Sequence, residues 1–292
     1  MRSNHSTRHS TRKKPRRRYR SVVYFLLALA VFLSPVVLTH YKNVEQHNLA
    51  AQYSEDIALL PAEYIDPILA DAHAYNEGLV DFPVSDPWKY GVDTNSSAYH
   101  DYENHLNVDG LMARIEIPSV GVDLPVYHGT STDVLAAGVG HLFGTDLPVG
   151  GMGTHSVLTG HTGMATLTMF DNLTSVEEGE IFTVESMGQK IAYQVDQIQT
   201  VLPDEVEHLR AEEGKDQMTL VTCTPYGLNT HRLLVRGQRV EVPEQPLTRT
   251  YYSPWQPWMV ASVVISVLTL LYLVWWLVRR GRQTRKAQRA GV

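Results

Sequence analysis

Two long apolar runs without a charged residue constrain this chain more than any other feature. They occupy residues 21–39 and 258–278 of 292. Each is close to the roughly 20 residues that a helix needs to cross the hydrocarbon core of a bilayer. The second run ends in a Trp-Trp pair followed by Arg279 and Arg280, which is typical of a membrane interface. We therefore expect two transmembrane helices that flank the rest of the chain.

Charge is divided between the segments outside these runs and the segment between them. Residues 1–20 carry nine Lys/Arg and residues 279–292 carry six, with no acidic residue in either tail. Residues 41–257 hold all 31 Asp/Glu against ten Lys/Arg, a net charge of −21. Since basic flanks stay on the cytoplasmic side, we expect both termini to be cytoplasmic and the middle segment to be extracytoplasmic. The tails would attract anionic lipid. The acidity of the middle argues against nucleic-acid binding, because its net negative charge would repel phosphates.

The first apolar run has a second interpretation, a cleaved signal peptide, because a basic segment precedes it. No small-x-small cleavage site follows; the residues at 35–40 are Pro-Val-Val-Leu-Thr-His, which are bulky. We favour a retained anchor at residues 21–40 and leave cleavage open. The middle segment, about 217 residues, is long enough for one sizeable core with an elaboration.

Periodicity divides this middle segment into three parts. Residues 41–80 place apolar side chains at helical spacing, with breaks expected near Pro61 and Pro67. Residues 81–108 contain Pro, Gly and Asn with few aliphatic residues, which predicts a long loop. Residues 109–243 change to a period of two with many turn signals. This pattern predicts a mainly β fold, a closed or nearly closed barrel with short helices.

The predicted order of segments follows from these boundaries. The strands are expected at residues 111–117, 122–127, 155–158, 180–185, 190–198, 218–223 and 232–242, with short helical turns at 130–138 and 166–173. From the N-terminus we expect a basic tail (1–20), a membrane helix (21–40), a helical segment (41–80), a loop (81–108), the barrel (109–243), a linker (244–257), a second membrane helix (258–278) and a basic tail (279–292).

One cysteine, Cys223, ends an apolar, β-branched run, Thr-Leu-Val-Thr-Cys-Thr-Pro at 219–225. A lone extracytoplasmic cysteine cannot form an internal disulfide, so it is either a buried, inert thiol or a reactive one. Two residues fit a reactive thiol: His161, within Thr-Gly-His-Thr-Gly at 159–163, and Arg232, on the next predicted strand. A nearby cation favours the thiolate, and arginine can also hold a carbonyl or a developing oxyanion. Each residue alone is weak support, since a solitary cysteine is more often a core residue than a nucleophile.

Together these motifs resemble the sortases, and within them the class C, pilus-assembling group. The resemblance rests on the motifs at 159–163 and 219–227 and on Asn-Thr-His-Arg-Leu-Leu-Val-Arg-Gly at 229–237. It covers residues 109–242 strongly and the helical segment more loosely. It implies a sortase-type β-barrel that needs no metal or organic cofactor.

The resemblance also implies roles for the three residues. Cys223 would attack the Thr–Gly peptide of an LPXTG-like sorting signal on a pilin. His161 would protonate the leaving glycine amine and later accept a proton from the incoming amine. Arg232 would hold the threonine carbonyl of the thioacyl intermediate. A lysine of the next pilin would then resolve that intermediate as an isopeptide bond.

The loop before the barrel contains Asp86, Pro87 and Trp88 in sequence. They resemble the Asp-Pro-aromatic lid that class C sortases lay over their own active site. The resemblance implies that Asp86 pairs with Arg232. It also implies that Trp88 covers the Cys223 sulfur and that Pro87 stiffens the turn. The alternative is an ordinary Asp-Pro turn with an aromatic side chain packed on the barrel.

Other histidines have simpler interpretations. His155, six residues before His161, could compete as the base but lacks the glycine frame. His231 adjoins Arg232 and should point to the opposite face of its strand. His141 is expected in a loop or in the core. Between residues 41 and 257 no H-x-x-x-H motif or tight carboxylate cluster occurs, so no metal site is expected there.

The two apolar runs predict a membrane-anchored protein, and the resemblance implies a cysteine transpeptidase that polymerises pilins at the surface of a Gram-positive cell. One alternative is a housekeeping sortase that attaches proteins to peptidoglycan; the lid motif and the second membrane helix argue against it. The other is a nonenzymatic, membrane-tethered scaffold that binds sorting signals. The joint presence of cysteine, histidine and arginine argues against that.

Overall fold

The computed structural model describes residues 16–79, 84–89, 91–244 and 256–289. The expected features at residues 1–15, at the start of the loop and in the linker at 245–255 lie outside these ranges. The chain divides into two compact units. The first comprises Met1–Val37 and Pro257–Val292, and the second comprises Leu38–Gln256.

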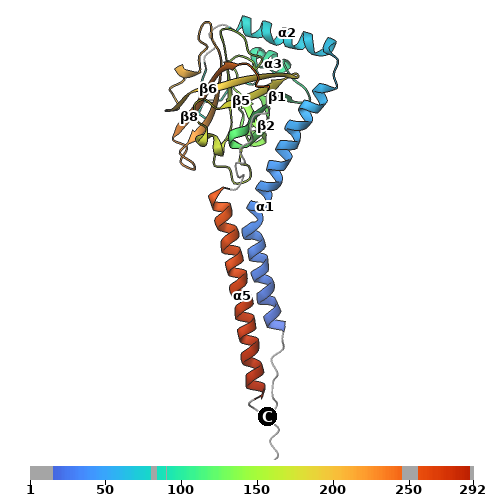
Figure 1. The fold of residues 1–292 in the computed structure, drawn as a ribbon, viewed down its shortest axis with the longest axis vertical. Helices are drawn as coiled ribbons and strands as arrows, with labels where there is room; N and C mark the ends of the chain where they lie inside the picture. The colour runs from blue at the N-terminus through green and yellow to red at the C-terminus, as the bar shows by residue number, and fades with distance from the viewer. Residues whose placement is uncertain (1–15, 80–83, 90, 245–255, 290–292) are drawn as a thin grey trace, which may run out of the picture. The chain divides into compact units, whose positions relative to one another are not determined.

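Two long helices, α1 (Arg16–Ala58) and α5 (Pro257–Arg289), contain the two apolar runs (Figure 1). Both are long and apolar enough to cross a membrane, as the sequence predicted. Pro35 lies inside α1 and has no N–H to donate to the Val31 carbonyl four residues earlier. The Ser34 hydroxyl donates to that carbonyl at 2.8 Å, so the helix continues past the proline with this acceptor satisfied.

The helices at the start of the second unit differ from the prediction at Pro67. Pro61 separates α1 from α2 (Ala62–Gly78) as expected, but Pro67 lies inside α2, so the second predicted break was wrong. Ile65, Ile68 and Leu69 of α2 pack against the barrel core, and this packing offsets one missing backbone hydrogen bond.

The predicted loop contains a further helix, α3 (Ser97–Asn104). The Ser96 hydroxyl caps it by accepting from the Tyr99 N–H at 3.2 Å. Tyr99 and Tyr102, three residues apart on α3, are both buried, which explains why a helix forms in a stretch with few aliphatic residues.

The rest of the second unit is a closed β-barrel, as predicted. Its strand order is β1-β2-β3-β4-β7-β8-β6-β5, and β1 pairs with β5 to close it. The strands are β1 (Leu111–Ile117), β2 (Val122–His128), β3 (Val139–His141), β4 (Thr154–Thr159), β5 (Ile181–Ser186), β6 (Gln189–Val201), β7 (Asp216–Thr224) and β8 (His231–Val240). Short helices lie at η1 (Pro118–Val120), α4 (Thr132–Ala137), η2 (Asp171–Ser175) and η3 (Glu207–Leu209).

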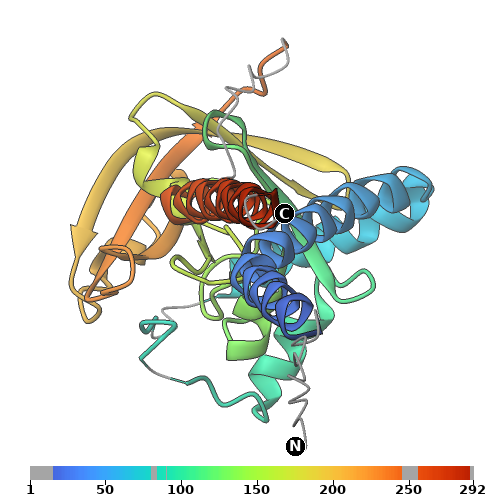
Figure 2. The same ribbon diagram turned by 90° about the horizontal axis from the view of Figure 1, so that it is seen from below.

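The second half of α1 is built into this unit. Tyr53 is buried, donates its hydroxyl to the Met112 carbonyl at 3.0 Å and accepts from the Met187 N–H at 2.9 Å. Ile57, one turn later, is fully buried in the same core. Figure 2 shows the end of α1 and α2 on one side of the barrel and strands β7 and β8, in orange, on the other.

Strand direction determines where the sequence motifs meet. β4 and β7 are parallel neighbours, so the ends of both lie at the same rim of the barrel. β8 runs antiparallel to β7 and therefore begins at that rim. The residues after β4, at the end of β7 and at the start of β8 are thereby brought together.

Candidate active site

Cys223 and Arg232 face each other across the β7–β8 ladder. They are direct partners in the antiparallel register, although nine residues separate them in sequence. Cys223 is 5% exposed and Arg232 is 7% exposed. Burial raises the pKa of the Cys223 thiol; the positive charge of Arg232 lowers it in part, and the negative charge of Asp86 raises it further. The thiol is therefore neutral in the resting structure.

His161 lies two residues beyond the end of β4, beside the end of β7. The Gly160 N–H donates to the Val221 carbonyl at 3.0 Å, and the Thr222 hydroxyl donates to the Gly160 carbonyl at 2.8 Å. These bonds extend the β4–β7 pairing past the strand end and bring His161 to the rim that Cys223 occupies. Partial burial lowers the pKa of His161, so the imidazole also rests neutral.

Asp86 and Arg232 form a buried, bidentate ion pair. Asp86 Oδ2 accepts from Arg232 Nε at 2.6 Å, and Oδ1 accepts from Nη2 at 3.0 Å. Asp86 is 2% exposed, so this pair is shielded from water and the loss of one partner would leave an uncompensated charge. The pairing that the sequence resemblance implied is present.

The Trp88 side chain contacts both His161 and Arg232. Its Nε1–H donates to His161 Nδ1 at 3.3 Å, so the neutral imidazole has its own proton on Nε2. The guanidinium carbon of Arg232 lies 4.7 Å from the centre of the Trp88 ring, within cation–π range. Trp88 thus contacts His161 and Arg232; its expected cover over the Cys223 sulfur stays a prediction.

The segment around Asp86 is held by local and distant contacts. Asp86 Oδ1 accepts from the Trp88 and Lys89 N–H groups at 3.1 and 2.8 Å, which forms an Asx-type turn with Pro87 inside it. Lys89 Nζ lies 2.7 Å from both carboxylate oxygens of Asp204, in the segment after β6. Val84 and Trp88 also pack on a small apolar cluster: Leu142, Val157, Val201, Leu209, Val221 and Leu234.

Comparison with known proteins agrees with this geometry. Residues 115–240 match the sequence model of the sortase domain. The crystal structure of sortase C-1 from Actinomyces oris is 51% identical, with a TM-score of 0.59, over 61% of this chain and 99% of that one. The chain belongs to the sortase family.

Two other relatives of this sortase carry the names sortase C and sortase A. The crystal structure of Streptococcus pneumoniae sortase C, described as bearing on catalysis and pilin substrate specificity, is 36% identical with a TM-score of 0.62. It covers 68% of this chain and 100% of that one. Sortase A of Bacillus anthracis is 29% identical over 135 residues, 46% of this chain and 62% of that protein. The chain spans about 52–62% of the length of the curated relatives it matches.

Three other histidines of this sortase have their contacts outside the group of Cys223, His161 and Arg232. His155 is buried, with Nδ1 2.9 Å from the Arg210 carbonyl and Nε2 2.7 Å from Thr219 Oγ1. Both ring nitrogens are thus engaged away from the site. His141 lies in the core on β3, where burial lowers its pKa to about 3. His231 Nδ1 lies 2.8 Å from the hydroxyl of its neighbour Thr230.

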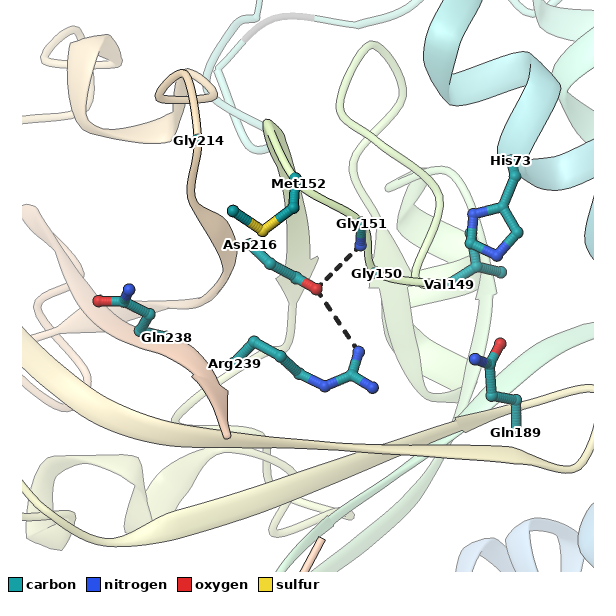
Figure 3. Close-up of a pocket in the computed structure, with 10 residues that line it drawn as sticks. All are labelled: His73, Val149, Gly150, Gly151, Met152, Gln189, Gly214, Asp216, Gln238 and Arg239. Atoms are coloured by element: carbon teal, nitrogen blue, oxygen red, sulfur yellow. Dashed lines mark hydrogen bonds and ion pairs between the residues drawn. The ribbon is translucent and has the colours of Figure 1, made fainter. Parts of the chain in front are cut away.

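A hollow of about 490 Å³ lies at the opposite end of the barrel (Figure 3). Asp216, the first residue of β7, lines it and is held by the Gly151 N–H at 2.9 Å and by Arg239 at 3.5 Å. Cys223 is seven residues further along β7, about 23 Å away at strand rise. This hollow therefore does not belong to the cysteine site, despite its size.

Two observations complete the site. Among the described residues, no group of three or more His, Cys, Asp or Glu side chains is placed to hold a metal ion. Sequence reasoning missed a buried carboxylate beside the histidine, Asp171. It is one of 31 acidic residues and belongs to no motif that would have distinguished it.

Proposed function

We propose that this sortase is a membrane-anchored cysteine transpeptidase of class C that joins pilin subunits. The observation that carries the proposal is that Cys223, His161 and Arg232 lie at one barrel rim, where Asp86 binds Arg232 and Trp88 binds His161. A thiol, a proton carrier and a fixed cation are the groups that acyl transfer through a thioester requires.

The resting site is closed and neutral. The hydrogen bonds of Asp86 occupy two nitrogens of Arg232, and Trp88 occupies His161 Nδ1. A sorting signal must displace this lid segment before its carbonyl oxygen can reach the guanidinium. Displacement of Asp86 also removes the negative charge that raises the pKa of Cys223, so substrate entry favours the thiolate.

The reaction follows from these groups. Cys223 transfers its proton to His161, and the thiolate attacks the threonine carbonyl carbon of an LPXTG-like signal. Arg232 stabilises the oxyanion of the tetrahedral intermediate. Protonated His161 then gives its proton to the leaving glycine amine as the C–N bond breaks, which leaves a thioester on Cys223. A lysine amine of the next pilin attacks the thioester, His161 accepts the amine proton, and the thiol is restored as the isopeptide bond forms.

Class C is favoured by the lid segment, by the second membrane helix and by the 51% identity to a sortase C. Pilin substrates are supported by what is said of the Streptococcus pneumoniae relative. A housekeeping sortase remains the second candidate, because curated relatives include enzymes named sortase A. In either class the barrel lies outside the cell, with both basic tails in the cytoplasm.

Intact-mass measurement on the full chain in detergent micelles tests the proposal. We expect an LPXTG peptide to give a covalent adduct that hydroxylamine removes, and we expect no adduct with Cys223→Ala. Addition of a pilin-derived lysine peptide should give an isopeptide product in preference to a peptidoglycan stem peptide. Adducts on Cys223→Ala, or peptide binding without any adduct on the wild type, would exclude the mechanism and leave the scaffold alternative.

A further inference from the structure

The segment that bears His161 folds back on itself. We call residues 161–171 the histidine loop. The Phe170 N–H donates to the His161 carbonyl at 3.1 Å and closes the loop. Asp171 Oδ1 then accepts from the Thr162 hydroxyl at 3.0 Å and from the Gly163 N–H at 2.7 Å. The two residues that follow His161 are thus bound to a single carboxylate oxygen.

The burial of the Asp171 carboxylate lowers the stability of the folded chain. It is 7% exposed, and its second oxygen, Oδ2, has no hydrogen-bond partner among the described residues. Burial raises its pKa to about 6, although the bonds from Gly163 and Thr162 oppose the rise. A buried, half-satisfied carboxylate lowers stability. Stability therefore does not explain the presence of Asp171 here. Its two hydrogen bonds to the residues that follow His161 do.

The far part of the loop is fastened to α1. The Asn43 side chain makes two bonds to Thr168: Nδ2 donates to Oγ1 at 2.6 Å, and Oδ1 accepts from the backbone N–H at 3.0 Å. One turn earlier on α1, the buried Thr39 hydroxyl donates to the Ala165 carbonyl at 2.9 Å. All these residues belong to the same compact unit.

Apolar packing is strongest at one end of the loop. Leu167, Met169 and Phe170 are buried in the barrel core. Residues 163–166, by contrast, are exposed or half-buried, and of these Met164 packs against the core with a partly buried side chain. The half that begins at His161 therefore has less apolar packing, and the hydrogen bonds of Asp171, Thr39 and Asn43 supply the rest of what holds it in position.

We propose that Asp171 and Asn43 are positioning residues that keep His161 in place beside Cys223, so that the first turns of α1 beyond the membrane run form part of the catalytic apparatus. The proposal rests on the proposed function for its kinetic consequence. Misplacement of a catalytic group by about 1 Å can cost on the order of 100-fold in rate. Neither residue touches the reacting atoms, so they should act on kcat more than on KM.

The kinetic test uses the full chain in detergent micelles. Asp171→Ala should lower kcat by about 100-fold and Asn43→Ala by about tenfold, each with little change in KM. Asp171→Asn should recover most of the activity, because an amide oxygen can accept the same two hydrogen bonds. Lys42→Ala is the matched control, since its side chain pairs with Glu45 on the same helix and not with the loop.

A double-mutant cycle tests the path through Thr168. If Asn43 acts through this residue, Asn43→Ala combined with Thr168→Val should lower kcat no further than Asn43→Ala alone. Additive losses would overturn that path. Rates should be measured well below each variant's melting temperature. Losses that follow the unfolded fraction, or values equal to those of Lys42→Ala, would overturn the positioning role.

A second measurement does not depend on substrate. The Trp88 indole N–H, which donates to His161, gives an NMR signal that Trp88→Phe would assign. We expect this signal to shift in Asp171→Ala and Asn43→Ala but not in Lys42→Ala. An unshifted signal would overturn the positioning role even if the enzyme acts as proposed. If the signal shifts in these two variants but the wild type never forms an adduct with the peptide, the proposed function alone is excluded.

Discussion

The proposed reaction needs Cys223 as thiolate and His161 as imidazolium, but both groups are neutral when the site is at rest. Burial raises the pKa of the thiol and lowers the pKa of the imidazole, so the neutral pair is favoured over thiolate and imidazolium. Arg232 opposes this effect at the sulfur, but Asp86 already occupies two of its nitrogens. Burial is therefore the main reason that the Cys223 thiol stays protonated, and Asp86 offsets part of the opposing positive charge of Arg232.

Asp171 should make the folded chain less stable as pH rises. Its pKa is raised from 3.8 to about 6, so between these values the folded state binds a proton that the unfolded state releases. The stability from this group is full below about pH 4 and is lost as pH rises through about 6. A difference of about two pKa units corresponds to about 3 kcal/mol.

Urea unfolding of the wild type and Asp171→Asn at several pH values measures this effect. The variant cannot titrate, so the wild type should lose stability relative to it between about pH 4 and pH 7. A stability difference that stays constant over that range would contradict the raised pKa.

At the scale of elements, the lid segment should control access to the thiol. Asp86→Ala removes the ion pair with Arg232, and Trp88→Ala removes the ring that lies on His161 and Arg232. Either change should raise the rate at which a small alkylating reagent modifies Cys223, by about tenfold or more if the closed state dominates. Lys190→Ala, which breaks a surface ion pair with Glu116, is the control. Equal labelling rates in the wild type and the three variants would show that this segment does not restrict access to Cys223.

The histidine loop also depends on a glycine. A Cβ at Gly160 would lie 2.6 Å from the ring of Phe170, which is fully buried and cannot move aside. Gly160→Ala should therefore displace the loop, lower stability by about 1–3 kcal/mol and reduce kcat. Gly78→Ala, where a Cβ would meet nothing within 4 Å, should leave both unchanged. Thermal unfolding and peptide turnover on the two variants would check this.

The elements differ in how far sequence could predict them. β1 and β8 were predictable because alternating apolar residues end at recognisable turns. β3 was not, because Val139–His141 is too short to show a period and exists through its pairing with β2 and β4. The Asp86–Arg232 pair spans 146 residues and could be predicted only through resemblance to a family. Asp171 had neither a pattern nor a motif, since its role comes from where the loop folds back.

At the scale of the whole molecule, α1 joins two tasks in one helix. Its first part carries the apolar run, and its second part supplies Tyr53 and Ile57 to the barrel core and Asn43 to the histidine loop. A membrane anchor joined by a flexible linker could not hold a catalytic loop in register. In α1 the residues that contact the histidine loop lie on regular helix, whose backbone hydrogen bonds hold Thr39 and Asn43 in register with Tyr53.

The charge partition predicts the side of the membrane on which the site lies, and the single cysteine makes this measurable. Cys223 is the sole cysteine of the chain, so a membrane-impermeant maleimide reports on it alone. In intact cells the Trp88→Ala variant should be labelled without lysis, because basic flanks keep both tails in the cytoplasm. Cys223→Ala should stay unlabelled. Moving the cysteine to the C-terminal tail, with Cys223→Ala and Ala287→Cys together, should restore labelling only after the membrane is permeabilised. Labelling of the tail cysteine in intact cells would reverse the topology and place the thiol where no secreted pilin could reach it.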